Sequence, residues 1–378
     1  MVNETMSSPR RYEMDWLRVF AILAVFVFHS CRFFDQMDWH VKSATTHASV
    51  QGWIMFLNAW LMPLMFVISG ASLFYAVGKG NVGSFIRDKV LRLFVPLLVG
   101  IFTHIALGVY LERITHHQYS GSFFSFYPHY FEGMYGLGGN CAWTGLHLWY
   151  LLVLFIFSIV FLPLFYLLKG SARGFTNKLG NFLSLPGVIL ILILPVGLSA
   201  IFAPRIFGAW PTSTYLLYLF YGFIIFSHDR LQEHIRQMRI FYLGLALVVS
   251  IIMVWQFGYI LPPKGTQSYL YFGLGFIISS WCCILAFIGF ALKYLTTNGP
   301  FLKHANEAVL PFFIMHQTVL LCLGYLILPW QIPDFVKWLL IALSSFILII
   351  VLYEFAVRRF NLLRILFGMK PLPNARTR

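Results

Sequence analysis

Ten long apolar runs limit what this 378-residue chain can fold into. A helix that crosses the hydrocarbon core of a bilayer needs about 20 predominantly apolar residues. Runs of this length recur from one end of the chain to the other, and the fifth is the least secure because Pro186 and Pro195 interrupt it. The expected spans are 16–34, 53–77, 90–111, 147–168, 185–203, 213–228, 240–260, 269–293, 308–328 and 335–357.

The composition excludes the other broad classes of protein. Hydrophobic residues make up 59 % of the chain and charged residues only 11 %, whereas soluble domains carry about 25 % charged residues. Disorder, coiled coil and collagen are excluded as well, and the alternating pattern of a membrane β-barrel is absent. We therefore expect an all-α polytopic membrane protein whose residues 1–378 form a single integral membrane domain.

The basic residues indicate how the chain is oriented in the bilayer. The net charge is +14, and with the N-terminus inside, 21 of the 27 Lys and Arg residues fall on the cytoplasmic side. This bias predicts ten spans with both termini in the cytoplasm, and the charge also attracts anionic lipid. The first run, 16–34, lacks a signal-peptide cleavage site and is expected to remain as an anchor. A nucleic-acid partner is not expected, because no soluble basic domain is present.

Ionisable residues inside a span are costly, so each is a candidate functional residue. Arg18 and His29 lie eleven residues apart in the first span. At about 100° per residue they return to within roughly 20° of one helix face, about 16 Å apart along the axis. Asp15 is three residues before Arg18 and can pair with it. The alternative interpretation is an Arg that reaches the interface and a His that contacts a neighbouring helix.

Other polar residues in the spans allow two interpretations each. Lys89 and Arg92 share a face and suit a phosphate, or form an ordinary positive-inside flank. His316 and Gln317, near mid-bilayer, mark a site or contacts between helices. His104 is a further ionisable residue of the third span, and Glu354 is expected to pair with Arg358 at i+4.

The longest outer loop, 112–146, is rich in aromatic residues and glycine. Aromatic faces beside hydrogen-bonding groups suit a sugar, but aromatic residues also gather at any membrane interface. His116, His117 and His129 lie in this loop without the partner spacing of a metal site. The five cysteines show no such spacing either, so no metal is predicted.

Several motifs occur in an order that matches a known family. They are the Arg18-to-His29 spacing, the Lys89/Arg92 pair, and the segments 62–70, 147–152 and 312–316. In these features the chain resembles the membrane-bound acyltransferase 3 family over essentially its whole length. Within that family it is most similar to the glucan biosynthesis protein C branch of glucan succinyltransferases. That likeness lies in the segments 39–44, 147–149, 306–308, 352–354 and 368–371.

The resemblance implies an enzyme of the bacterial inner membrane. Such an enzyme moves an acyl group, succinyl or acetyl, from cytoplasmic acyl-CoA to a hydroxyl of an extracytoplasmic glycan, here a periplasmic glucan. Acyl-CoA is then a donor substrate, and no permanently bound cofactor is expected. The oligomeric state stays open.

The resemblance and the chemistry together suggest a role for each candidate residue. His29 is the expected general base or acyl carrier, because a neutral imidazole with a pKa of about 6.5 can take a proton. His316 is expected to orient His29 or to stabilise an oxyanion. The remaining candidates are Arg18, Lys89 and Arg92 for the phosphates of CoA, and His40, His147 and Trp149 for the acceptor.

Two points count against a simple assignment. The family usually has Arg where Lys89 stands, and Lys binds phosphate as a point charge without a bidentate fork. Counted from the ends of the apolar runs, His316 lies roughly 12 Å and His29 roughly 20 Å from the inner surface, so contact between them would need a tilt or a kink. A transporter of a glycan precursor or organic anion is the alternative function, and a sensor or assembly partner is a third.

Overall fold

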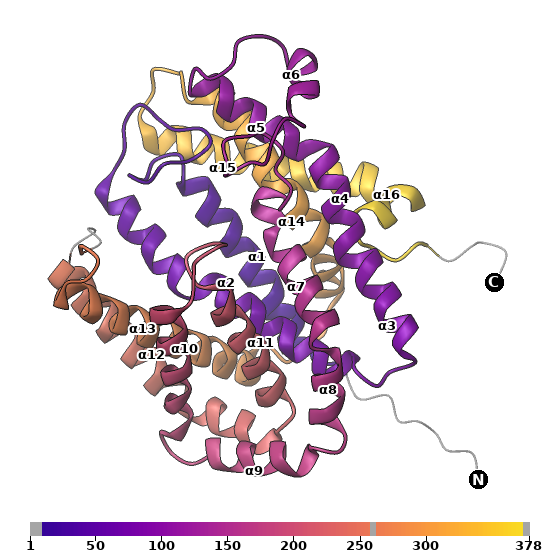
Figure 1. The fold of residues 1–378 in the computed structure, drawn as a ribbon, viewed down its shortest axis with the longest axis vertical. Helices are drawn as coiled ribbons and strands as arrows, with labels where there is room; N and C mark the ends of the chain where they lie inside the picture. Colours follow the sequence, from indigo (N-terminus) through magenta and orange to yellow (C-terminus); the bar gives the residue numbers. More distant parts are fainter. Residues whose placement is uncertain (1–9, 258–261, 373–378) are drawn as a thin grey trace.

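The computed structural model describes residues 10–257 and 262–372, and these fold into helices without a β-strand (Figure 1). This confirms the all-α class. Six helices are long and apolar enough to cross a membrane. They are α1 (Tyr12–Cys31), α2 (Ala48–Ala76), α12 (Asp229–Phe257), α13 (Gln267–Tyr294), α14 (Pro300–Ile327) and α15 (Asp334–Leu352).

Three further candidate spans are bent pairs of helices. The helical stretch Val82–Phe102, which contains α3 (Val82–Lys89) and α4 (Val95–Phe102), meets α5 (His104–Thr115) at 42°. A stretch ending in α7 (Trp149–Val160) meets α8 (Leu162–Lys169) at 57°. The sharpest bend, 114°, separates α9 (Arg173–Leu183) from the stretch that ends in α10 (Ile193–Phe202).

The described residues therefore hold six to nine candidate spans, fewer than the ten expected from the sequence. The expected span 213–228 is α11 (Thr212–Phe226), a shorter apolar helix of 15 residues. The expected span 185–203 begins at the 114° bend, where Pro186 is followed by Gly187 at φ +77°, and its helical part is Val188–Phe202. Residues 258–260 of the expected span 240–260 lie outside the described residues.

The first helix occupies the middle of the bundle. It packs against α2, α13, α14 and α15, and most of its side chains toward these neighbours are buried. α12, which packs against α13, and α15 lie at the periphery (Figure 1). Only 11 % of the apolar window of α12 and 17 % of that of α15 are buried, so these helices present apolar faces suited to lipid.

Two glycines allow α2 and α11 to touch along their backbones. A Cβ added at Gly70 would lie 1.8 Å from the carbonyl oxygen of Leu219, and one at Gly222 would lie 2.0 Å from that of Val67. Small residues at such crossings let membrane helices approach closely and gain van der Waals contact. This contact holds α2 firmly, and α2 carries Ser69 and Ser72, which line the cavity described below.

The two ends of the bundle differ in character. At one end, here called the basic end, α3 and α16 (Asn361–Leu366) lie near the start of α1. At the other, the loop end, residues 32–47 and 116–146 fold over the helices, and the second loop contains α6 (Phe123–His129). In Figure 1, α3 and α16 are on the right, and the indigo loop after α1 is at the upper left.

The Gly70 contact predicts a measurable loss of stability. Gly70→Ala forces a methyl group into the backbone of α11, and overpacking of this kind costs about 1 to 3 kcal/mol or more. We expect a lower midpoint of thermal unfolding in detergent. Gly244→Ala in α12 is the matched control, because nothing lies within 4 Å of its added Cβ. Equal midpoints for the two variants would contradict the assigned contact.

Candidate active site

Four histidines from different elements meet in the loop-end half of the bundle. His29 is on α1, His104 begins α5, His147 is in the turn Leu146–Leu148, and His316 is on α14. The ring centroids of His29 and His316 are 4.9 Å apart, those of His316 and His147 are 4.9 Å apart, and those of His147 and His104 are 6.3 Å apart. The sequence alone indicated each as a candidate, but not that they cluster.

His29 and His316 are in contact, contrary to the different depths expected from the apolar runs. Nδ1 of His29 and Nε2 of His316 are 3.1 Å apart. The expectation failed because α14 begins at Pro300, eight residues before the apolar run, with polar residues such as Asn306 in its first turns. His316 is then about 24 Å and His29 about 25 Å from the starts of their helices, which is the same depth.

Hydrogen bonds to the backbone fix the protonation pattern of this pair. Nδ1 of His316 lies 2.6 Å from the carbonyl oxygen of Phe313, so it carries the proton and Nε2 is an acceptor. Nδ1 of His29 then donates, both to His316 and to the carbonyl of Val25 at 3.0 Å. Nε2 of His29 keeps its lone pair, and no described residue bonds to it. Since His29 is only half-buried, this nitrogen is available as a base.

The other two histidines each have one buried ring nitrogen without a partner among the described residues. His147 donates from Nε2 to the carbonyl of Ile314 at 3.1 Å, and its Nδ1 has no partner among the described residues. Nδ1 of His104 lies 2.9 Å from Oγ1 of Thr318, and its Nε2 is likewise unpartnered. Buried unpaired acceptors cost free energy, so these two positions are retained at a cost to stability.

A cavity of about 550 Å³ opens at the basic end and runs toward the histidines. Its inner part is walled mainly by apolar side chains, together with the hydroxyls of Ser69 and Tyr150, which are 2.5 Å apart. Phe313 forms part of this wall, and its ring lies 5.5 Å from that of His316 and 5.9 Å from that of His147. The inner end of the cavity therefore adjoins the histidine cluster.

The outer part of the cavity holds the three cations indicated by the sequence, Arg18, Lys89 and Arg92. Arg18 is fixed by Asp15 at 3.1 Å, as expected, and also by Ser72 at 2.7 Å and Asn306 at 3.3 Å. A second cavity of about 630 Å³ shares several lining residues with the first. Four lysines that line one or both cavities have no carboxylate partner among the described residues: Lys79, Lys89, Lys303 and Lys370.

Trp39 links the histidine cluster to the loop end. Its ring centroid is 6.2 Å from that of His29 and 5.6 Å from that of His40, and the guanidinium of Arg32 lies 5.9 Å from it. The sequence singled out His40 but not this tryptophan. Trp149, in contrast, stacks on Phe207 with centroids 5.7 Å apart, in an aromatic group away from these contacts.

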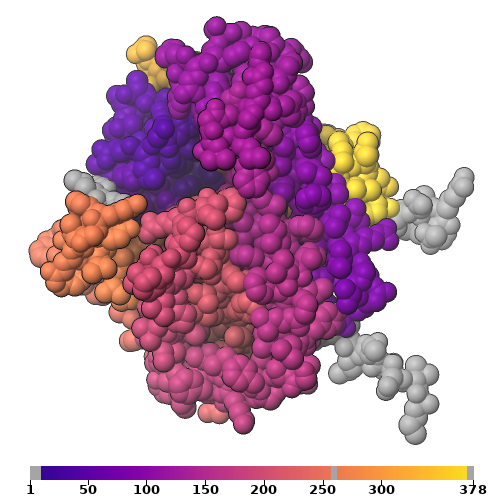
Figure 2. Space-filling model, viewed as in Figure 1, coloured from indigo at the N-terminus to yellow at the C-terminus, as the bar shows by residue number. Residues whose placement is uncertain are grey.

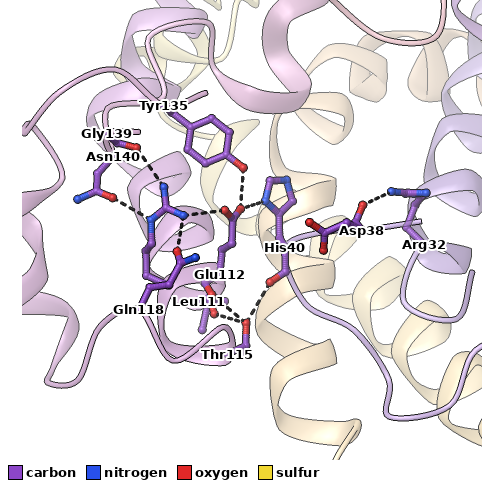
Figure 3. A network of polar contacts seen from close by, with 11 residues as sticks. Arg32, Asp38, His40, Leu111, Glu112, Thr115, Gln118, Tyr135, Gly139 and Asn140 are labelled. Carbon is purple, nitrogen blue, oxygen red and sulfur yellow. Dashed lines mark hydrogen bonds and ion pairs between the residues drawn. The ribbon is translucent and has the colours of Figure 1, made fainter. Parts of the chain in front are cut away.

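A buried carboxylate joins the two loops of the loop end (Figure 3). Glu112 is 7 % exposed and bonds to Nδ1 of His40, to the hydroxyl of Tyr135 at 2.7 Å and to Arg113 at 3.1 Å. Burial, reinforced by this carboxylate, raises the pKa of Tyr135, which therefore stays a donor. Sequence reasoning missed Glu112, although a lone acid at the end of an apolar run is a signal that could have revealed it.

The ion pair expected for Glu354 can be compared with the structure. Glu354 pairs with Arg358 at 2.8 Å, as expected from their spacing. His129 in the outer loop pairs with Glu132 at 2.8 Å. Within residues 10–257 and 262–372, no group of three His, Cys, Asp or Glu side chains is placed to hold a metal ion.

The network at Glu112 predicts that its loss loosens the loop end. Glu112→Ala removes a buried carboxylate from three half-buried donors, and breaking a buried ion pair costs about 3 to 5 kcal/mol. We expect a lower unfolding midpoint and faster proteolysis between residues 116 and 146. Glu233→Ala is the control, since Glu233 pairs with Arg236 in an exposed position. If Glu112→Ala resists protease like the parent protein, the network does not hold the loop.

Comparison with known proteins agrees with this geometry. The acyltransferase domain family matches residues 11–354. Similar curated proteins include the glucans biosynthesis protein C of Salmonella paratyphi B, Salmonella heidelberg and Salmonella agona. Each is 26 % identical over 163 residues, which are 43 % of this chain and 40 % of the relative's length. No solved structure matches.

The family match extends over most of the chain and includes the histidine cluster and most residues that line the cavity, but not those of 364–370. With its candidate spans, this makes the chain a multi-pass membrane protein. The chain belongs to the acyltransferase domain family.

Proposed function

We propose that this protein is an O-acyltransferase of a bacterial inner membrane. It takes a succinyl or acetyl group from cytoplasmic acyl-CoA and places it on a hydroxyl of an extracytoplasmic glycan, a periplasmic glucan. The observation that carries the proposal is the free Nε2 lone pair of His29, located between a basic cavity and the aromatic loop end. The printed name of the Salmonella relatives supports a glucan acceptor.

The cavity suits an acyl-CoA thioester. Its outer part offers Arg18, Lys89 and Arg92 to the phosphates, and its apolar inner part suits the pantetheine arm. Phe313 marks the inner end beside His316, so a thioester there would lie next to the histidine cluster. The basic end is then cytoplasmic, in agreement with the positive-inside bias of the sequence.

His29 is proposed as the general base. Its Nε2 takes the proton of the glycan hydroxyl while the hydroxyl oxygen attacks the thioester carbonyl. The tetrahedral intermediate then expels the CoA sulfur, and the proton held by His29 passes to the thiolate. The same lone pair would attack the carbonyl in an acyl relay, which differs by forming acyl-His29 before the hydroxyl arrives.

His316 is proposed to orient His29. Its Nε2 accepts the Nδ1 proton of His29, which keeps the reactive lone pair on Nε2 and stabilises the imidazolium that forms. A role for His316 in binding an oxyanion has less support, because its only N–H group is directed at the carbonyl of Phe313. Trp39 and His40, next to His29, are proposed to contact the acceptor, with His147 beside them.

His29→Ala should abolish transfer without abolishing donor binding. We expect CoA release from labelled succinyl-CoA or acetyl-CoA, in detergent with a candidate glucan, to fall by about 10² to 10⁴ fold. Binding of CoA should be unchanged, because His29 does not line the cavity. His129→Ala, on the exposed loop, is the control. Full turnover by His29→Ala would overturn the proposal, and CoA binding without turnover in the parent protein would favour a transporter or sensor.

Lys89→Ala should weaken use of the donor. Loss of one charge-assisted contact is expected to raise the KM for acyl-CoA about tenfold with little change in kcat, because the lysine is remote from the reacting carbon. Lys178→Ala on α9 removes an exposed charge away from the cavity and should leave KM unchanged. A fall in kcat alone would place Lys89 in a different role.

A further inference from the structure

The chain after α15 folds back across the basic end. Residues 361–372, here called the C-terminal strap, comprise α16 and a turn, and they pack against α4 (Figure 2, yellow against purple). Arg364 holds the strap in place. It is 5 % exposed and donates to Glu307 at 2.7 Å, to the carbonyl of Lys370 at 2.7 Å and to that of Arg358 at 3.1 Å. Three fixed acceptors make the strap a defined part of the fold.

A glycine lets the strap touch the helix that carries Arg92. Gly368 has φ +72°, and a Cβ there would lie 2.9 Å from the carbonyl oxygen of Arg92 and 2.6 Å from the side chain of Leu310. The next residue, Met369, is buried. The strap is therefore pressed against both α14 and the turn that places Arg92 in the cavity.

The strap forms part of the wall of the cavity. Arg364, Gly368, Met369 and Lys370 all line the 550 Å³ cavity, and Lys370 also lines the neighbouring one. Four cations are shared by the two cavities. Arg10 and Arg18 pair with Asp15, and Arg92 lies 3.8 Å from Asp88. Lys370 is the one shared cation that has no carboxylate partner within the described ranges.

We propose that the C-terminal strap completes the donor site and that Lys370 binds a phosphate of the nucleotide end of CoA. This inference rests on the proposed function, in which the cavity holds acyl-CoA. An unpaired ammonium where the two cavities adjoin offers a point charge to a phosphate. The hydrogen bond from Arg364 to the carbonyl of Lys370 fixes the backbone of Lys370 before the ligand binds, which lowers the entropy lost on binding.

The test measures equilibrium binding of three probes to the full chain in lipid nanodiscs. The probes are CoA, 3′-dephospho-CoA and pantetheine, which lacks every nucleotide phosphate. Lys370→Ala should weaken CoA binding about tenfold and leave pantetheine binding unchanged. Lys370→Arg should restore most of the affinity. Arg359→Ala, which removes an exposed neighbouring charge outside the cavity, is the matched control.

The probes also identify the phosphate. If Lys370→Ala has no effect on 3′-dephospho-CoA, Lys370 contacts the 3′-phosphate; if the effect remains, it contacts the diphosphate. Unchanged CoA affinity, or equal losses for CoA and pantetheine, would overturn the assignment to Lys370 alone. Failure of the parent protein to bind CoA would overturn the proposed function together with this inference.

Discussion

The hydrogen bond between His29 and His316 is the contact on which the rest of the site depends. It joins α1, in the middle of the bundle, to α14, and it lies where apolar packing leaves few other partners. The only N–H group of His316 donates a hydrogen bond to the carbonyl of Phe313. Nε2 of His316 can therefore only accept a hydrogen bond from His29. Because His29 must donate from Nδ1, its lone pair stays on Nε2, the nitrogen that points away from His316. Trp39, His40 and the Glu112 network extend from His29 toward the loop end.

The lining of the cavity changes from charged at the basic end to apolar near the histidines. At the basic end, cations outnumber carboxylates, and lysines there have no ionic partner among the described residues. Toward the interior the walls become apolar, and the last polar groups before the histidines are the hydroxyls of Ser69 and Tyr150. Such a gradient matches a molecule with a charged head and a long neutral arm. The glycine contact between α2 and α11 keeps one wall of this passage rigid.

The sequence was sufficient for the helical class, for the Asp15 and Arg18 pair and for most residues of the site, because burial of ionisable groups in apolar runs is visible without a structure. It indicated ten spans where the described residues hold six to nine candidates, and it did not reveal the bends within them. Local breaks such as Thr103, with φ −125° and ψ −98°, and the Pro186–Gly187 turn depend on tertiary packing as well as on composition. It misjudged the depth of His316 because the apolar run was taken to end where polar residues begin, whereas α14 extends through these polar residues back to Pro300. The contact of Arg364 with Glu307 and that of His40 with Glu112 join residues 57 and 72 positions apart, so no local pattern could indicate them.

Phe313 has a consequence for the membrane as a whole. Its ring lines the basic cavity and contacts the rings of His147 and His316, and none of the four histidines lines that cavity. A row of imidazoles open to water on both sides would conduct protons and dissipate the electrochemical gradient of the cell. The apolar ring of Phe313 lies where water from the basic end would have to pass to reach the imidazoles, and a donor that fills the cavity would replace that water, so this position disfavours a continuous path for protons across the bilayer.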